Sequence, residues 1–106
     1  MVFNPINPIP KIITNLPSLK VVKYGSVIQV IFTASGVANG DDFSSLLGGN
    51  LPITPSIAMF SNANDGQLYH LRIGTSGIVN IISTSGSEIS GAISAIGTLT
   101  FITDNV

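Results

Sequence analysis

His70 and Arg72 are the two side chains whose types and spacing best fit a binding site. They lie two residues apart in the alternating stretch 67–73, and residues two apart on a strand point to the same face of a sheet. Arg72 offers a fork of N–H donors, whereas His70 offers one donor and one acceptor. Such a pair can grip hydroxyls or an anionic group. The same spacing also fits an ordinary solvent-exposed strand face, so the pattern alone leaves both interpretations open.

The sequence contains few of the residue types that catalytic sites use. The chain has one histidine and no cysteine, so a Ser–His–Asp triad could be built only around His70, and no nucleophile-elbow pattern accompanies it. Disulfides, zinc–thiolate sites and cysteine nucleophiles are excluded together. We therefore expect a protein that is not an enzyme and that needs no cofactor.

A glycan hydrolase is kept as an alternative because it needs only two carboxylates facing each other across a sugar. Asp41 and Asp42 are adjacent, so they point opposite ways in an extended chain. Asp65 is explained by its place in a turn. A catalytic pair would therefore need two acids that are distant in the sequence to meet in space. The five acids are Asp41, Asp42, Asp65, Glu88 and Asp104.

The acidic loop could in principle hold a metal. Asp41, Asp42 and nearby carbonyls are ligands that calcium accepts, but an aspartate that caps a single turn over Phe43 to Leu47 explains the same residues more simply. Gly48 and Gly49 fit an ordinary turn, with no glycine-rich loop that opens a helix toward a phosphate. We expect no metal here.

Composition narrows the classes of partner. The 106 residues carry four basic and five acidic side chains, for a net charge of −1, whereas nucleic-acid binding needs a basic surface. Only 8% of residues are charged and 44% are hydrophobic, against about 25% charged in ordinary domains. Either Ser, Thr, Asn and Gly form much of the surface, or part of the surface is buried against other copies of the chain, and we expect both. The apolar runs are too short for a membrane span, and no signal peptide is apparent.

The elements indicate an all-β fold. Residues 1–18 hold four of the six prolines and are expected to form an extended arm or a sheet edge, followed by a β domain over 19–106. Strands are predicted at 21–24, 27–33, 56–61, 67–73, 78–82 and 98–103, with loops over 37–50 and 83–96. About seven short strands with regular turns favour a compact sandwich or barrel. Alternation turns Tyr69, Leu71 and Ile73 toward the core.

Three segments together resemble a known family. The first segment is the run Gly40-Asp41-Asp42-Phe43 to Asn50-Leu51-Pro52, which precedes Pro55. The second is the strand Leu68-Tyr69-His70-Leu71-Arg72-Ile73, which ends in the turn Gly74-Thr75-Ser76-Gly77. The third is a final strand that begins with Gly97-Thr98. This order is similar to the C-terminal head domain of phage tail receptor-binding proteins, above all those of lactococcal siphophages, and it covers roughly residues 20–106. The resemblance implies a compact β head, a homotrimer, and binding of host cell-wall saccharide at or near subunit contacts.

Within that resemblance His70 matches the histidine that contacts the sugar. The chain departs from the family at three positions: Arg72 stands where the family usually has an acid, Ile81 or Ile82 where it has a tryptophan, and Ala95-Ile96 near a missing arginine. These departures leave open a different ligand, or binding elsewhere, for example at the Asn62-to-Gln67 turn or at the Asp41 loop. The candidate saccharide-binding residues are His70, Arg72, Asn62, Asn64 and Asp65.

The expected function is thus a receptor-binding head in the virion, at the phage tail tip or baseplate, that adheres to host saccharide outside the cell. Other tail or baseplate proteins are expected to bind its N-terminal segment, with no nucleic acid and no membrane insertion. The alternative is a structural virion protein, such as a spike tip or baseplate connector, which binds other viral proteins. The low charge and the proline-rich arm fit both.

Overall fold

The computed structural model describes residues 10–104, which form seven β-strands and no helix. This confirms the prediction of an all-β fold with about seven strands. The strands are β1 (Lys11–Asn15), β2 (Leu19–Tyr24), β3 (Val27–Ala38), β4 (Ser56–Asn62), β5 (Leu68–Ile73), β6 (Val79–Ser83) and β7 (Ala92–Ile102).

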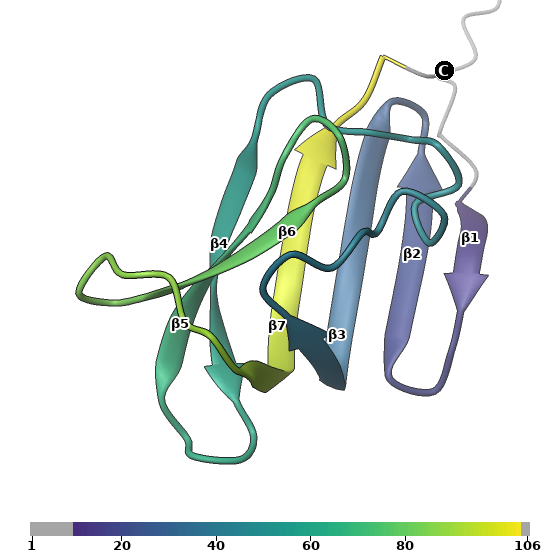
Figure 1. The fold of residues 1–106 in the computed structure, drawn as a ribbon. Coiled ribbons are helices and arrows are strands. Elements are labelled where there is room, and N and C mark those ends of the chain that lie inside the picture. Colours follow the sequence, from purple (N-terminus) through teal and green to yellow (C-terminus); the bar gives the residue numbers. More distant parts are fainter. Residues whose placement is uncertain (1–9, 105–106) are drawn as a thin grey trace, which may run out of the picture.

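All seven strands belong to one antiparallel sheet with the order β1-β2-β3-β7-β4-β5-β6 (Figure 1). Neighbours in sequence form the hairpins at both ends, whereas β7 enters the middle between β3 and β4. The strand β1 comes from the proline-rich segment 1–18 and forms one edge of the sheet, so at least Lys11–Asn15 belongs to the sheet of the domain itself. The expected arm over residues 1–9 lies outside the described residues.

A β-bulge in β3 keeps the apolar residues of this long strand on one face. Thr33 pairs with Ile96 and Ser35 with Ala95, so Ala34 is an extra residue, and its φ is 60°. Phe32 and Ser35 are three positions apart, yet both are buried, because the inserted residue resets the alternation. A bulge also bends and twists its strand.

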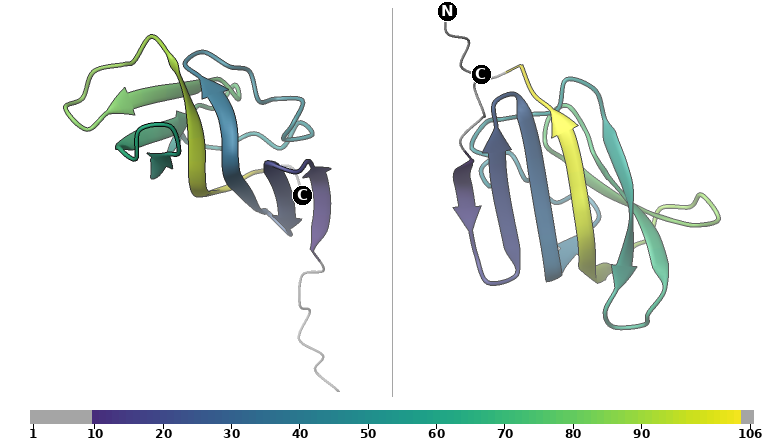
Figure 2. Two further views of the ribbon diagram at one scale, coloured as in Figure 1. Left: turned by 90° about the horizontal axis from the view of Figure 1, so that it is seen from below. Right: turned by 180° about the vertical axis from the view of Figure 1, so that it is seen from behind.

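The sheet curls so that β6, at one end of it, reaches the chain that follows β3. Beyond β3, the chain at Gly40 and Asp41 exchanges backbone hydrogen bonds of 2.7 and 2.8 Å with Val79 at the start of β6. Figure 2 shows the curvature end-on, with the β4–β6 half turned toward the β1–β3 half. The two halves face each other across the core, which gives the fold its sandwich character.

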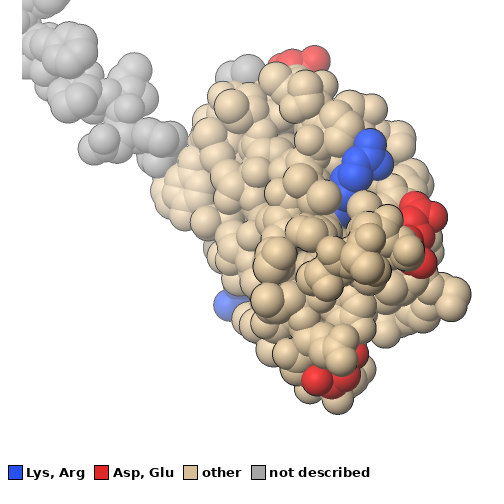
Figure 3. All heavy atoms as spheres, turned by 90° about the vertical axis from the view of Figure 1, so that its left-hand side faces the viewer, with Lys and Arg blue, Asp and Glu red and all other residues tan. Residues whose placement is uncertain are grey.

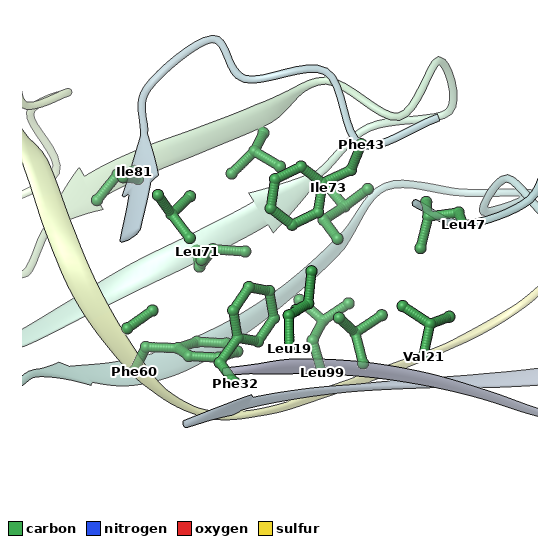
Figure 4. Close-up of a cluster of buried hydrophobic side chains, with 14 of the residues drawn as sticks. Leu19, Val21, Phe32, Phe43, Leu47, Phe60, Leu71, Ile73, Ile81 and Leu99 are labelled. Carbon is green, nitrogen blue, oxygen red and sulfur yellow. The ribbon is translucent and has the colours of Figure 1, made fainter. Parts of the chain in front are cut away.

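The hydrophobic core fills the concave side of the curved sheet, and the loop over residues 39–55, between β3 and β4, covers it. Figure 4 shows Phe43 and Leu47 from the loop meeting Phe32 and Leu99 from the sheet. Leu47 N–H donates to the Phe43 carbonyl at 2.9 Å, which makes the single turn predicted over 43–47. The buried apolar side chains are Leu19, Val21, Ile28, Val30, Phe32, Val37, Phe43, Leu47, Phe60, Leu71, Ile73, Val79, Ile81, Ile93, Ala95, Leu99 and Phe101.

The structure corrects two predicted loops. The segment 37–50 begins with the end of β3, which runs to Ala38, and the segment 83–96 contains the start of β7, which begins at Ala92. Both stretches are rich in small residues with weak strand propensity. They form strands because Val37 pairs with Ile93 and Ala38 with Ala92, so each segment supplies the backbone hydrogen-bond partners of the other.

Candidate functional site

The outward face of β5 and β6 carries a row of polar side chains. His70 and Arg72 are half-buried on the face opposite to buried Leu71 and Ile73, as the alternation predicted. Arg72 pairs in register with Asn80 of β6, and its Nη1 donates a hydrogen bond of 3.2 Å to Asn80 Oδ1. We call His70, Arg72 and Asn80 the polar row.

Asn39, which follows β3, fixes the orientation of Asn80 in the polar row. Asn39 Oδ1 accepts the backbone N–H of Ile81 at 2.9 Å and the side-chain amide of Asn80 at 3.4 Å. The Asn80 carboxamide is therefore oriented with its oxygen toward Arg72. Arg72 forms no ion pair with a described residue, so the other donors of its guanidinium remain open to an external acceptor.

Large apolar side chains surround the polar row on the same face. Met59 of β4 and Ile82 of β6 pair with His70 on either side, and Ile57 pairs with Arg72. Four of the outward apolar residues are about half exposed, and we call them the β4 patch: Ile57 (55%), Met59 (50%), Leu68 (48%) and Ile96 (45%). Figure 3 views the side of the molecule that carries β4 and β5 and shows only isolated charged groups on it.

The other candidate residues lie at the tip of the β4–β5 hairpin. Asn62 is buried, and its Oδ1 accepts the backbone N–H groups of Asn64 at 3.1 Å and Ser94 at 2.9 Å. The Asn62 side chain thus links the turn to β7 by hydrogen bonds and does not face solvent. The structure therefore places Asn62 as a support of the turn, with Asn64 and Asp65 exposed beyond it.

Asp65 is held in a fixed orientation at this tip. The backbone N–H of Gln67 donates to its Oδ1 and the Tyr69 hydroxyl donates to its Oδ2, both at 2.9 Å. The hydrogen bond from Gln67 is the main cause that lowers the pKa of the carboxyl below its ordinary value; burial opposes it, and the hydrogen bond from Tyr69 adds to the lowering. Donation to Asp65 is in turn the main cause that raises the pKa of Tyr69.

The sequence candidates consequently fall into two places. His70 and Arg72 lie on the outward face of β5, whereas Asp65 and Asn64 project from the hairpin tip, where Tyr69 joins them from the inward face. Asn80 and the site role of Tyr69 were not predicted. Asn80 had a signal, since it lies on the predicted strand 78–82, which the turn Gly74-Thr75-Ser76-Gly77 joins to the His70 strand.

Asp41 and Asp42 have local structural roles. Asp42 Oδ1 accepts the backbone N–H of Ser44 at 2.9 Å, which makes it the predicted cap of the single turn, and this bond lowers the Asp42 pKa. Asp41 Oδ2 accepts the N–H of Ala38 at 2.9 Å. Over residues 10–104 no three His, Cys, Asp or Glu side chains gather as a metal site requires.

Comparisons with protein-family models, with curated proteins and with solved structures find no match for this chain. In the part of the chain that the structure describes, no helix is long and apolar enough to cross a membrane. The chemistry of the polar row, the β4 patch and the hairpin tip is therefore the basis for a functional proposal.

Proposed function

We propose that this chain is a receptor-binding head of a phage tail or baseplate, a non-enzymatic module of the virion that adheres to saccharide on the host cell surface. The observation that supports this most directly is the polar row on an otherwise apolar, nearly uncharged face. Ligand sites are mostly apolar surfaces with a few placed polar groups that fix orientation. A sugar has the matching chemistry, with apolar C–H faces and a rim of hydroxyls.

Each member of the polar row has a defined task in this proposal. Arg72, fixed at one nitrogen by Asn80, directs its other donors at ring hydroxyls or at an acidic substituent. His70 adds one donor and one acceptor. Ile82 of β6, directly beside His70 in register, provides the apolar surface on which the sugar ring lies.

Substitution of Arg72 is the direct test of this site. We expect Arg72→Ala to weaken binding to purified bacterial cell-wall polysaccharide by about tenfold or more, since hydrogen bonds to a charged group contribute about 1.5–3 kcal/mol. Arg72→Lys should fail to restore binding, because an ammonium lacks the planar fork. His70→Ala should also weaken it. Surface plasmon resonance on immobilised polysaccharide measures all three.

Lys20→Ala is the matched control, since Lys20 is an exposed cation on the outward side of β2. It should leave affinity unchanged. Equal losses for Lys20→Ala and Arg72→Ala would reveal nonspecific charge attraction. Full binding by both Arg72→Ala and His70→Ala would overturn the polar row as the saccharide site.

We propose further that the head works as a homotrimer and that the β4 patch is buried where the copies meet. An exposed apolar patch of several large residues is typical of protein–protein contacts. With a net charge of −1, electrostatic repulsion opposes assembly only weakly. Three copies on one particle also compensate for weak single contacts, since multivalency raises avidity by about 10²–10⁴. Other tail proteins would bind the N-terminal segment.

The native mass in solution tests the assembly. Light scattering behind a sizing column should give about three times the 11.0 kDa of one chain, and Met59→Asp should give the monomer, because burial of an unpaired charge is costly. Ile53→Asp is the control, since Ile53 is equally exposed but lies in the loop before β4. A monomeric native protein, or a trimeric Met59→Asp variant, would contradict the proposal.

The second candidate function is a structural virion protein that binds other viral proteins. The β4 patch favours it, because a large apolar surface serves a protein partner as well as a second copy. No binding to any cell-wall polysaccharide, together with association of the native chain with an isolated tail protein that Met59→Asp abolishes, would select this candidate.

A further inference from the structure

The tip of the β4–β5 hairpin is built as a rigid platform. Besides the two bonds to the Asn62 side chain, the Asn62 carbonyl accepts Gly66 N–H at 2.7 Å, and Ala63 N–H donates to the Ser94 carbonyl at 2.9 Å. The turn is thus bound both across the hairpin and to β7. Groups that project from such a turn are fixed before any ligand arrives, which lowers the entropic cost of binding.

The polar groups on this platform are the exposed carboxylate of Asp65, the exposed carboxamides of Asn64 and Gln67, and the hydroxyl of Tyr69. Asp65 uses two acceptor positions for Gln67 N–H and the Tyr69 hydroxyl. Asp65 is exposed, so hydroxyl groups from outside the turn can also reach its carboxylate, which has about four acceptor positions. The side chains of Asn64 and Gln67 flank it and are exposed. Tyr69 is half-buried, with its ring against the core and its hydroxyl at the exposed carboxylate.

We propose that this tip is a second saccharide subsite, specific for hydroxyl pairs of a neutral sugar, with Asp65 as the central acceptor. A fixed carboxylate accepts two hydroxyl protons at once, and neighbouring carboxamides add donors and acceptors. The negative charge excludes phosphorylated or acidic residues of a polymer, because like charges repel without a bridging cation. Tyr69 orients the carboxylate through its hydroxyl group.

The subsite rests on the proposed function, since it takes the chain to be a saccharide binder. It differs from the polar row in place and in charge. Asp65 lies at the tip and Arg72 is paired with Ile57 near the far end of the hairpin, about 20 Å away for extended chain. The two sites would therefore bind different sugar units of a polysaccharide. The tip would bind a neutral sugar, and the site at Arg72 would bind ring hydroxyls or an acidic substituent.

Amide chemical-shift mapping separates the two sites. The ¹⁵N-labelled native protein is titrated with glucose, galactose, rhamnose and N-acetylglucosamine, each neutral, at millimolar concentration. For at least one of them we expect shifts at residues 63–67, Tyr69 and Ser94. Shifts confined to β5 and β6 around Arg72 would overturn the subsite and leave the proposed function standing. No shift with any of the four would also overturn the subsite, while polysaccharide binding by the Arg72 series decides the function separately.

Paired variants test the role of the carboxylate. Asp65→Asn keeps an oxygen for Gln67 N–H but loses the charge, and we expect it to raise Kd for the shifting sugar by about tenfold or more. Asp42→Asn is the matched control, because Asp42 is also exposed and also accepts a backbone N–H two residues ahead at 2.9 Å. Tyr69→Phe should raise Kd as well, and Tyr24→Phe, at an exposed tyrosine on β2, should not. Unchanged Kd for Asp65→Asn would overturn the subsite.

Discussion

Replacement of Phe60 by alanine is expected to lower the free energy of unfolding by about 3–5 kcal/mol, the largest effect of any single truncation proposed for this chain. Phe60 is 1% exposed and its ring meets that of Phe32 edge to face, with centroids 4.9 Å apart. The ring lies where β4 joins β7, so its loss leaves a cavity at the junction of the two halves of the sheet. Neighbouring strands cannot collapse into that cavity without breaking their hydrogen bonds.

Urea unfolding followed by circular dichroism measures this effect. Ile53→Ala removes a comparable apolar side chain from an exposed site and should change the free energy by less than about 0.5 kcal/mol. A loss below about 1 kcal/mol for Phe60→Ala would mean that the ring does not fill the core as described.

The second large effect is expected at Gly97. Its position faces inward between Ala95 and Leu99, and a Cβ there would lie 2.8 Å from Cδ2 of the Phe60 ring. Phe60 is enclosed by the core and cannot retreat, and the φ of 157° at Gly97 is itself unfavourable for a residue with a side chain. Gly97→Ala should therefore destabilise the fold by about 1–3 kcal/mol through overpacking together with backbone strain. The absence of a side chain at this position is what admits the aromatic ring.

Two further variants isolate the steric cause. Gly36→Ala also changes a glycine within a long strand, but a Cβ at Gly36 meets nothing within 4 Å, so it should not destabilise. The double variant Gly97→Ala with Phe60→Leu should lose less than the sum of the two single changes, with a coupling of about 0.5–3 kcal/mol. Additive losses would contradict a direct clash between the two positions.

The fold class could be predicted because it depends on local patterns. Strict alternation over 68–73 identified Leu71 and Ile73 as buried and His70 and Arg72 as outward, and the pairs Gly25-Ser26 and Asp65-Gly66 marked their turns. The extent of β3 and β7 could not be predicted in this way. Their small residues are strands only because they pair with each other across the chain, and a bulge at Ala34 has no local signature.

The candidate site was predictable only as individual residues. Alternation placed His70 and Arg72 on one face, but the carboxamide that orients Arg72 comes from Asn80 on the next strand, and its register follows from the sheet. Tyr69 was predicted to face the core. Its ring does pack inward against the core, but its hydroxyl reaches the exposed carboxylate of Asp65. Asn62 looked like a surface turn residue, yet its oxygen pairs with a strand that is distant in sequence.

The central place of β7 has a consequence for how fast the chain reaches this structure. Val27 pairs with Ile102 and Val37 with Ile93, so the middle of the sheet joins segments separated by more than half the chain. Before β7 arrives, β3 and β4 have no common neighbour and their apolar faces remain in water. Folding should therefore be slow for a domain of this size, in milliseconds to seconds as for other proteins rich in non-local pairings. Until then the exposed strand edges invite aggregation.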